Sequence, residues 1–135
     1  MTPEQAELIR KSFDEIWPVR RKLAALFYSR FFELAPDAKR LFPDDLERQH
    51  LKLMDMIAAM VGALDQRELF QSVIHHTGRQ HAHFGVKSSY FEAFGEALIW
   101  SLEQQFGPRF TPALKEAWAR LYNIVETEMK RTAQM

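Results

Sequence analysis

Residues 91–106, FEAFGEALIWSLEQQF, contain the pattern that decides the fold class. The large apolar side chains of this stretch recur every three or four positions, at Phe91, Phe94, Leu98, Leu102 and Phe106. This spacing places them on one face of an α-helix. Ser89 and Glu92 are expected to cap the start of the helix, and Gly107-Pro108 is expected to end it.

The same spacing extends to both ends of the chain and predicts five further helices. Thr2, Pro3 and Gln5 form a capping box at the start of the first helix, and Pro18 breaks the chain after it. A second capping box is expected at residues 65–68. The predicted ranges are residues 2–16, 23–34, 46–64, 65–83 and 111–129, with one short helical turn between Pro36 and Pro43. The fold class is therefore all-α, with six main helices and one short helix.

Length and composition narrow the function classes. The chain has 135 residues, which predicts a single domain over residues 1–135. It has no cysteine, which excludes disulfide scaffolds, thiolate metal sites and cysteine nucleophiles. Eighteen basic residues balance eighteen acidic ones, which disfavours nucleic acid and anionic membranes as partners. The longest apolar run is residues 56–64, too short to cross a bilayer, and residues 1–5 do not resemble a signal peptide. A cytoplasmic location is therefore expected.

The histidines are the candidate metal ligands. They stand at His50, His75, His76, His81 and His83. Their spacing does not match a zinc site, which usually needs ligands three or four residues apart on one helix face. His81 differs because it continues the apolar line of its helix. Core packing is the ordinary explanation for such a histidine, but the chain also has eleven Phe and six Met. A flat apolar cofactor bound through one imidazole would explain both features.

Three groups of residues resemble the globin family. Residues 78–86, GRQHAHFGV, followed by residues 94–98, FGEAL, are similar to the segment of a globin that binds the iron. Leu41-Phe42-Pro43 resembles the globin corner whose Phe packs on haem. Residues 106–112, with Ala117-Trp118 and Tyr122, resemble the closing helices of single-domain bacterial globins and neuroglobins. The resemblance covers nearly the whole chain in order. It implies the globin fold, with haem b (iron protoporphyrin IX) as the cofactor.

The resemblance also implies a role for individual residues around the haem. His81 matches the iron ligand and Phe42 matches the ring that wedges the porphyrin. Tyr28 and Gln49 match the distal pair, whose phenol and amide can donate hydrogen bonds to a bound gas. Leu53 and Ile57 line the distal pocket if Gln49 is the distal residue, whereas a one-residue shift would put His50, Met54 and Ala58 there instead. The remaining expected haem contacts are Val86, Phe94 and Lys52, and Lys52 would reach a propionate.

The function implied by this resemblance is reversible binding of dioxygen, or of nitric oxide or carbon monoxide. The alternatives are nitric-oxide dioxygenation with a separate reductase, and a gas-sensing module. Flavohaemoglobins have a Tyr and a Glu that polarise the iron-binding histidine. Phe91 stands where that Tyr is expected, with Tyr90 beside it, and no matching Glu or reductase domain is found up to Met135. This departure favours gas binding over self-contained enzymatic turnover. The oligomeric state is left open.

Overall fold

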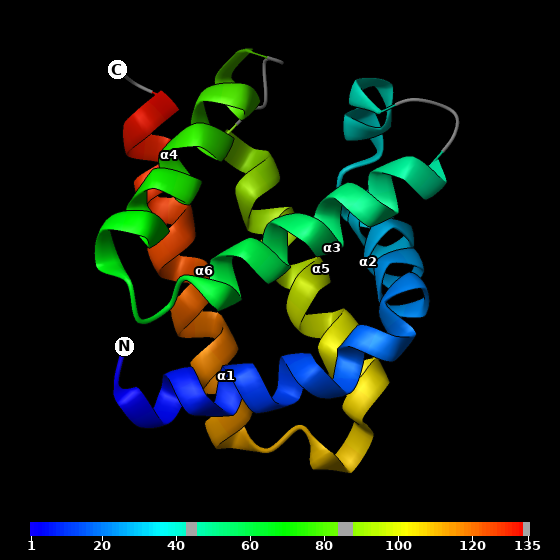
Figure 1. Cartoon of the computed structure of the whole chain (residues 1–135). Helices are drawn as coiled ribbons and strands as arrows, with labels where there is room; N and C mark the ends of the chain where they lie inside the picture. Colours follow the sequence, from blue (N-terminus) through cyan, green and yellow to red (C-terminus); the bar gives the residue numbers. More distant parts are fainter. Residues whose placement is uncertain (43–45, 84–87, 134–135) are drawn as a thin grey trace.

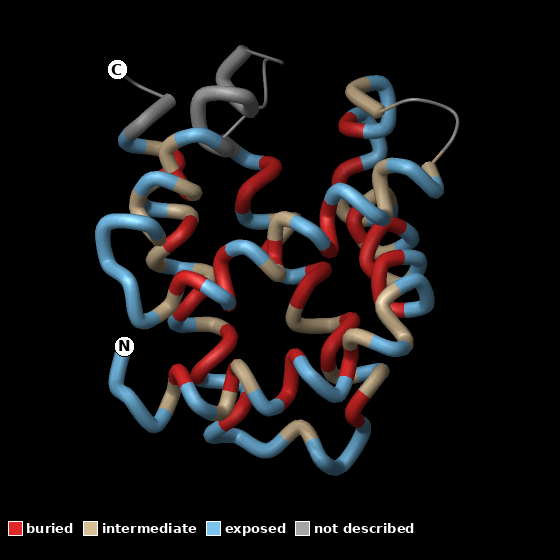
Figure 2. The backbone as a smooth tube through the Cα atoms, viewed as in Figure 1, coloured by how far each residue is buried: buried red, intermediate tan, exposed pale blue. Residues whose placement is uncertain are grey.

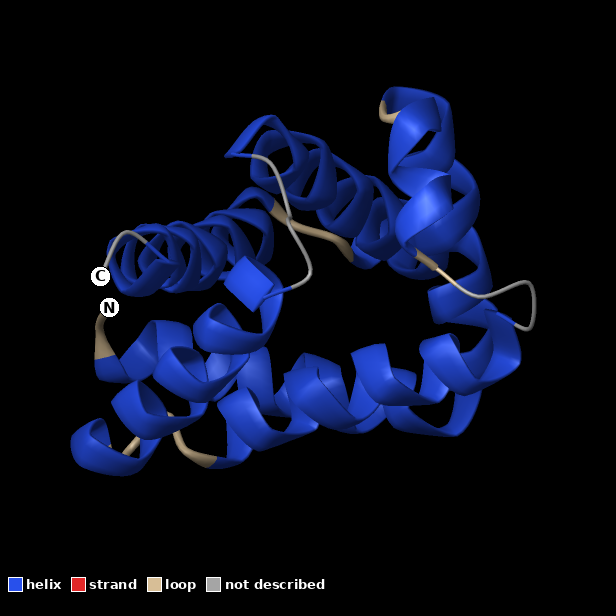
Figure 3. Cartoon of the chain, turned by 90° about the horizontal axis from the view of Figure 1, so that it is seen from above, coloured by secondary structure: helices blue, strands red, loops and turns tan. Residues whose placement is uncertain are grey.

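The computed structural model describes the backbone of residues 1–42, 46–83 and 88–133, and the side chains of residues 1–42, 46–76 and 89–131. Within these ranges the regular elements are all helices, joined by short loops, as Figure 3 shows. The six α-helices are α1 (Pro3–Ile16), α2 (Arg20–Leu34), α3 (Leu46–Gly62), α4 (Arg67–His83), α5 (Ser88–Phe106) and α6 (Pro112–Ala133). The three short 3-10 helices are η1 (Trp17–Val19), η2 (Pro36–Leu41) and η3 (Gly107–Arg109). The all-α prediction is confirmed, with three short helices rather than one.

Local sequence signals explain most helix boundaries. Thr2 caps α1 in a complete capping box with Gln5, and Pro18 lies in the 3-10 turn that separates α1 from α2. Thr111 accepts a hydrogen bond from the backbone N–H of Leu114 at the start of α6. Gly107 has φ of 58°, a left-handed conformation that favours glycine. The helix caps and helix breaks predicted at these positions are therefore confirmed.

Two predicted caps are wrong, one by one residue and the other by two. The α4 helix begins at Arg67, and the backbone N–H of Phe70 donates to the carbonyl of Gln66, so Gln66 occupies the cap position. The carboxylate of Asp65 forms an ion pair with Arg10 of α1 instead. The α5 helix begins at Ser88, so Ser89 lies inside its first turn. Asp65 thus makes a tertiary contact in place of the predicted cap.

The helices pack crosswise around one apolar core. The α2 helix packs mainly on α5, α4 packs on α6, and α1 contacts both α6 and α3. In Figure 1 the α3 helix crosses in front of α5, and Figure 2 shows the buried residues on the inward sides of the helices. Trp118 of α6 is 1% exposed and donates its indole N–H to the hydroxyl of Ser12 of α1 at 2.9 Å. This bond satisfies the one polar atom of a large buried ring.

No helix within the described residues combines the length and the apolar character that a bilayer crossing needs.

Gly95 sets the approach of α5 to α6. A Cβ atom at this position would lie 2.6 Å from Cε2 of Tyr122, whose ring is held by stacking on Phe94 and by a hydrogen bond to the Phe91 carbonyl. We expect Gly95→Ala to lower the free energy of unfolding by about 1–3 kcal/mol, because the ring has to shift. Denaturant unfolding measures the effect. Gly62→Ala is the matched control, since nothing lies within 4 Å of its Cβ position. Equal stabilities of the two variants would contradict this account.

Candidate functional site

Tyr28 is the buried polar residue around which the predicted distal residues gather. It lies in α2, is 4% exposed, and is positioned by an edge-on contact with the ring of Phe27. Its phenol donates to the backbone carbonyl of Gln49 at 3.5 Å, at the long limit of hydrogen-bond geometry. Burial raises the pKa of the phenol from 10.0 to about 12, and a side-chain hydrogen bond with Gln49 lowers it in part. Tyr28 is therefore a protonated donor at neutral pH.

Gln49 and His50 both reach Tyr28 from the first turns of α3. The imidazole of His50 stacks on the Tyr28 ring, with centroids 5.1 Å apart and planes at 14°. Burial lowers the pKa of His50 below its ordinary value of 6.5, and the charge of Glu47 opposes this shift in part. The imidazole is therefore neutral at pH 7. Both candidate distal residues are half-buried, so an amide and a neutral imidazole stand beside one phenol.

Burial along α3 is compatible with either distal register. Leu53 and Ile57, expected with Gln49, are 4% and 7% exposed. Met54, expected with His50, is 1% exposed, and Ala58 is half-buried. Lys52 is exposed on the same helix. Because α3 is covered on a broad face, burial alone does not choose between Gln49 and His50.

An aromatic cluster connects the predicted corner to α5. Phe42 follows η2, and its ring contacts those of Phe32 and Tyr28, with centroids 5.5 and 5.6 Å apart. The Phe31 ring lies between the rings of the two predicted haem contacts. Its centroid is 6.3 Å from that of Phe42 and 5.8 Å from that of Phe94. Phe42 and Phe94 are themselves half-buried although they pack against the core. The contribution of Phe32 was missed in the sequence because it lies off the regular apolar line of α2.

Two predicted site residues are not fully described: His81, the predicted iron ligand, and Val86, a predicted haem contact. The backbone of His81 is in α4, but its side chain lies outside the described part, as does that of His83. Val86 lies outside the described residues altogether. The assignment of His81 as a ligand therefore stays a prediction.

Two other histidines of α4 are described. His75 lies with its Nε2 3.5 Å from a carboxylate oxygen of Glu128 in α6, and His76 is exposed. Among the side chains that the structure describes, no group of three or more His, Asp or Glu residues could hold a metal ion. His75 thus contributes to the packing of α4 on α6.

Phe91 and Tyr90, which are expected near the iron-binding histidine, form hydrogen bonds with residues of α6 and η2. Phe91 is buried, and its carbonyl accepts a hydrogen bond from the phenol of Tyr122 at 2.5 Å. Burial raises the pKa of Tyr122, and the charge of Glu126 adds to this shift. Tyr90 is 4% exposed and donates to the carboxylate of Asp37 at 2.7 Å. This link between α5 and η2 was missed in the sequence, because the two residues are 53 positions apart.

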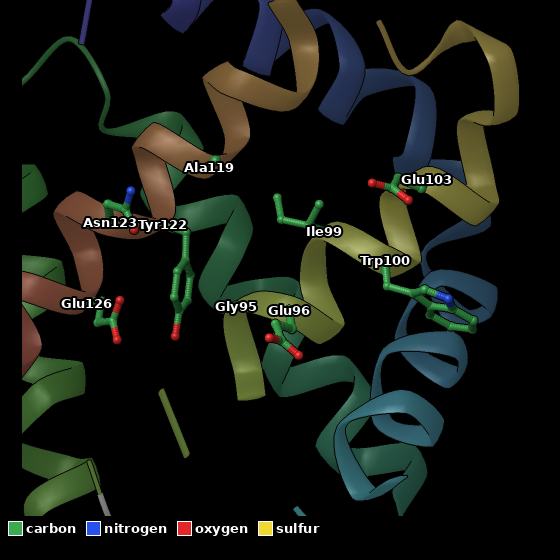
Figure 4. Close-up of a pocket in the computed structure, with 9 residues that line it drawn as sticks. All are labelled: Gly95, Glu96, Ile99, Trp100, Glu103, Ala119, Tyr122, Asn123 and Glu126. Atoms are coloured by element: carbon green, nitrogen blue, oxygen red, sulfur yellow. The ribbon is translucent and has the colours of Figure 1, made fainter. Parts of the chain in front are cut away.

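A separate groove of about 370 Å³ lies between α5 and α6 (Figure 4). It is lined by Gly95, Glu96, Ile99, Trp100, Glu103, Ala119, Tyr122, Asn123 and Glu126. Lys115 pairs with Glu103, and Lys130 pairs with Glu126. None of the predicted site residues whose side chains are described lines this groove. It is therefore distinct from the group around Tyr28 and Phe42.

The fold and the site together define a class of small all-helical proteins. In this class, crossed helices bring a pair of polar residues, here Tyr28 and Gln49, next to an aromatic side chain, here Phe42. The chain belongs to the globin family, whose family model matches residues 25–129. The chain is similar to neuroglobin of Tetraodon nigroviridis, with 30% identity over 146 aligned positions that cover 97% of this chain and 91% of the relative. Neuroglobin of Danio rerio is also 30% identical and covers 92% of this chain, which spans 87% of that relative.

A solved structure confirms the globin fold. The hexacoordinated haem protein from an anhydrobiotic tardigrade, solved at pH 4, superposes with a TM-score of 0.91. The alignment covers 100% of this chain and 96% of that protein, at 17% sequence identity. The predicted family and fold are thereby confirmed.

Proposed function

We propose that the chain binds haem b and uses it to bind dioxygen reversibly. The observation that carries the proposal is the position of Tyr28, a buried phenol that donates a long hydrogen bond to the Gln49 backbone carbonyl, beside His50 and the Phe42 ring. Membership of the globin family supports the cofactor, and the tardigrade protein of the same fold is a haem protein.

The residues present fit a haem. Phe42 and Phe94 are large apolar side chains that pack against the core on one side and stay half-buried, which suits rings that cover a flat apolar ligand. Leu53 and Ile57 add aliphatic surface from α3. We assign Phe42, Leu53, Ile57, Val86 and Phe94 to porphyrin contacts.

Two further residues would bind the polar parts of the cofactor. His81 would ligate the iron, and the exposed amine of Lys52 would pair with a propionate. When bound, haem supplies a coordination position for a diatomic gas.

The distal residues of this chain would hold the gas by hydrogen bonding. Tyr28 would donate from its phenol, because the pKa of about 12 keeps the proton in place at physiological pH. Gln49 would donate from its amide, and His50, which is neutral, would donate from one ring nitrogen. Each such bond contributes about 1 kcal/mol or more in a site that excludes water. The bonds would slow the release of dioxygen.

The arrangement near Phe91 favours gas binding over nitric-oxide dioxygenation. The phenol nearest in sequence, that of Tyr90, donates to Asp37 of η2. A hydrogen bond from Tyr90 to the iron-binding histidine would require that interaction to break. Rapid consumption of nitric oxide by the haem-loaded protein with an added reductant would favour the dioxygenase instead.

Haem titration and spectroscopy test the proposal. The purified chain is expected to take up one haem and to develop a Soret band, and the ferrous protein is expected to bind and release dioxygen reversibly. The spectrum of the deoxygenated ferrous protein then shows whether His50, Gln49 or no side chain occupies the sixth position. A folded chain that takes up no haem would refute the proposal.

A further inference from the structure

A hydrogen bond connects the two segments that lead to the proposed haem contacts. The phenol of Tyr90, in the first turn of α5, donates to the carboxylate of Asp37, in the first turn of η2, at 2.7 Å. The Tyr90 ring is 4% exposed, whereas Asp37 lies at the surface. A bond from a phenol to a carboxylate is charge-assisted and stronger than one between neutral groups.

On one side of this bond lie η2 and the residue that follows it, Phe42. These residues, 36–42, are called the Phe42 corner below. The η2 helix runs directly into Phe42, whose backbone N–H donates to the carbonyl of Lys39. Ala38 of η2 is fully buried, and its backbone N–H donates to the carbonyl of Ala35. In the described part of the chain, the ring–ring contacts of Phe42 are with Tyr28, Phe31 and Phe32, all in α2. The hydrogen bond between Asp37 and Tyr90 thus connects this corner to α5.

On the other side is the end of α4, which carries His81. The α4 helix ends at His83, and α5 begins at Ser88, so Tyr90 follows His81 by nine positions along the chain. An anchor on Tyr90 therefore restrains the first turn of α5, the helix that follows α4. The Asp37–Tyr90 bond therefore joins η2, which precedes Phe42, to the start of α5, the helix that follows His81 in the sequence.

We propose that Tyr90 and Asp37 are positioning residues that hold the Phe42 corner and the start of α5 at the spacing needed to retain haem. This inference rests on the proposed function. Without the bond, the corner would lose this connection to α5, and both sides of the haem slot would open more often. The predicted consequence is faster release of haem.

The test measures haem release from the loaded protein into an excess of an acceptor apoglobin. Tyr90→Phe keeps the buried ring and removes the hydroxyl, so release is expected to be about tenfold faster, the size expected for loss of one charge-assisted hydrogen bond. Asp37→Ala, at an exposed position, is expected to have the same effect. Asp37→Asn keeps an acceptor oxygen and is expected to have a smaller effect. The double variant Tyr90→Phe/Asp37→Ala is expected to release haem no faster than the stronger single variant.

A second measurement separates positioning from general stability. Hydrogen exchange of the Ala38 and Phe42 amides in the loaded protein is expected to accelerate in Tyr90→Phe. Ser12→Ala is the matched control, because it removes a buried hydrogen bond between α1 and α6 without touching η2. It is expected to lower the stability of the fold while leaving exchange at Phe42 unchanged.

The outcomes distinguish this inference from the function on which it rests. A wild-type chain that takes up no haem would overturn both. If the wild type retains haem and Tyr90→Phe releases it at the same rate, the positioning role is overturned alone. Strictly additive effects of Tyr90→Phe and Asp37→Ala would also overturn it, because the two groups would then not act through their mutual bond.

Discussion

The His81→Ala variant is expected to lose its Soret band, or to bind haem more than about 100-fold more weakly than the wild type. Replacing a residue that only supports a metal ligand typically costs roughly 10–100-fold in affinity, so removing the ligand itself should cost more. The chain has no cysteine that could substitute, and its other histidines lie at different positions. Haem titration followed by absorbance and by haem transfer measures the effect.

His76→Ala is the matched control for this experiment. His76 is exposed on the same helix, α4, so its removal tests the loss of an imidazole without the loss of the proposed ligand. Its haem affinity is expected to equal that of the wild type. Free imidazole in the buffer is expected to restore part of the spectrum of His81→Ala, since it can enter the space left by the side chain. Unchanged haem affinity and spectrum in His81→Ala would show that the ligand was assigned to the wrong residue.

The Tyr28→Phe variant is expected to release dioxygen about tenfold faster than the wild type. The substitution keeps the ring contacts with Phe27 and Phe42 and removes only the hydroxyl. A hydrogen bond to a polarised ligand in a buried site is worth about 1.5–3 kcal/mol, which corresponds to this change or a larger one. Stopped-flow measurement of oxygen dissociation tests the prediction. Tyr122→Phe removes the hydroxyl of a half-buried phenol that donates to the Phe91 carbonyl, and it is expected to change the rate little.

The effect of Tyr28 is also expected to be constant with pH over the neutral and mildly alkaline range. Burial raises the pKa of the folded protein's phenol to about 12, above its ordinary value of 10.0. The folded state therefore holds this proton more tightly than the unfolded state. Its contribution to stability is fully present below about pH 10 and declines as the pH rises toward 12. A ratio of Tyr28→Phe to wild-type dissociation rates that changed between pH 6 and 9 would contradict a donor with this pKa.

The helices could be predicted from the sequence because their determinants are local. Apolar residues at a spacing of three or four define a helix face wherever they occur, and Thr2, Pro18, Gly107 and Thr111 act on neighbouring backbone groups. The prediction was less accurate where a distant partner competes for the capping residue. Asp65 illustrates this, since its carboxylate pairs with Arg10 of α1.

The site was predictable only in part. The residue types at positions 28, 42, 49 and 53 were found because they occur in the order of a known family. The contact between Tyr28 and His50 could not be found in this way, because it depends on how α3 is rotated against α2. The contacts of the Phe31 ring with Phe42 and Phe94 could not be found from the sequence either. They depend on how α2 packs against α5 and against the segment that contains Phe42. The spectrum of the deoxygenated ferrous protein distinguishes Gln49 from His50 as the distal residue.

The sequence by itself determined the all-α class, the approximate helix ranges and the family, since each follows from local periodicity or from residues in linear order. Only the tertiary structure decided that Tyr28 stands beside both Gln49 and His50, that Gly95 admits the Tyr122 ring, and that Tyr90 bonds to Asp37. The physical reason is that each of these contacts joins different helices. Its geometry depends on the crossing and rotation of both, which local sequence does not specify.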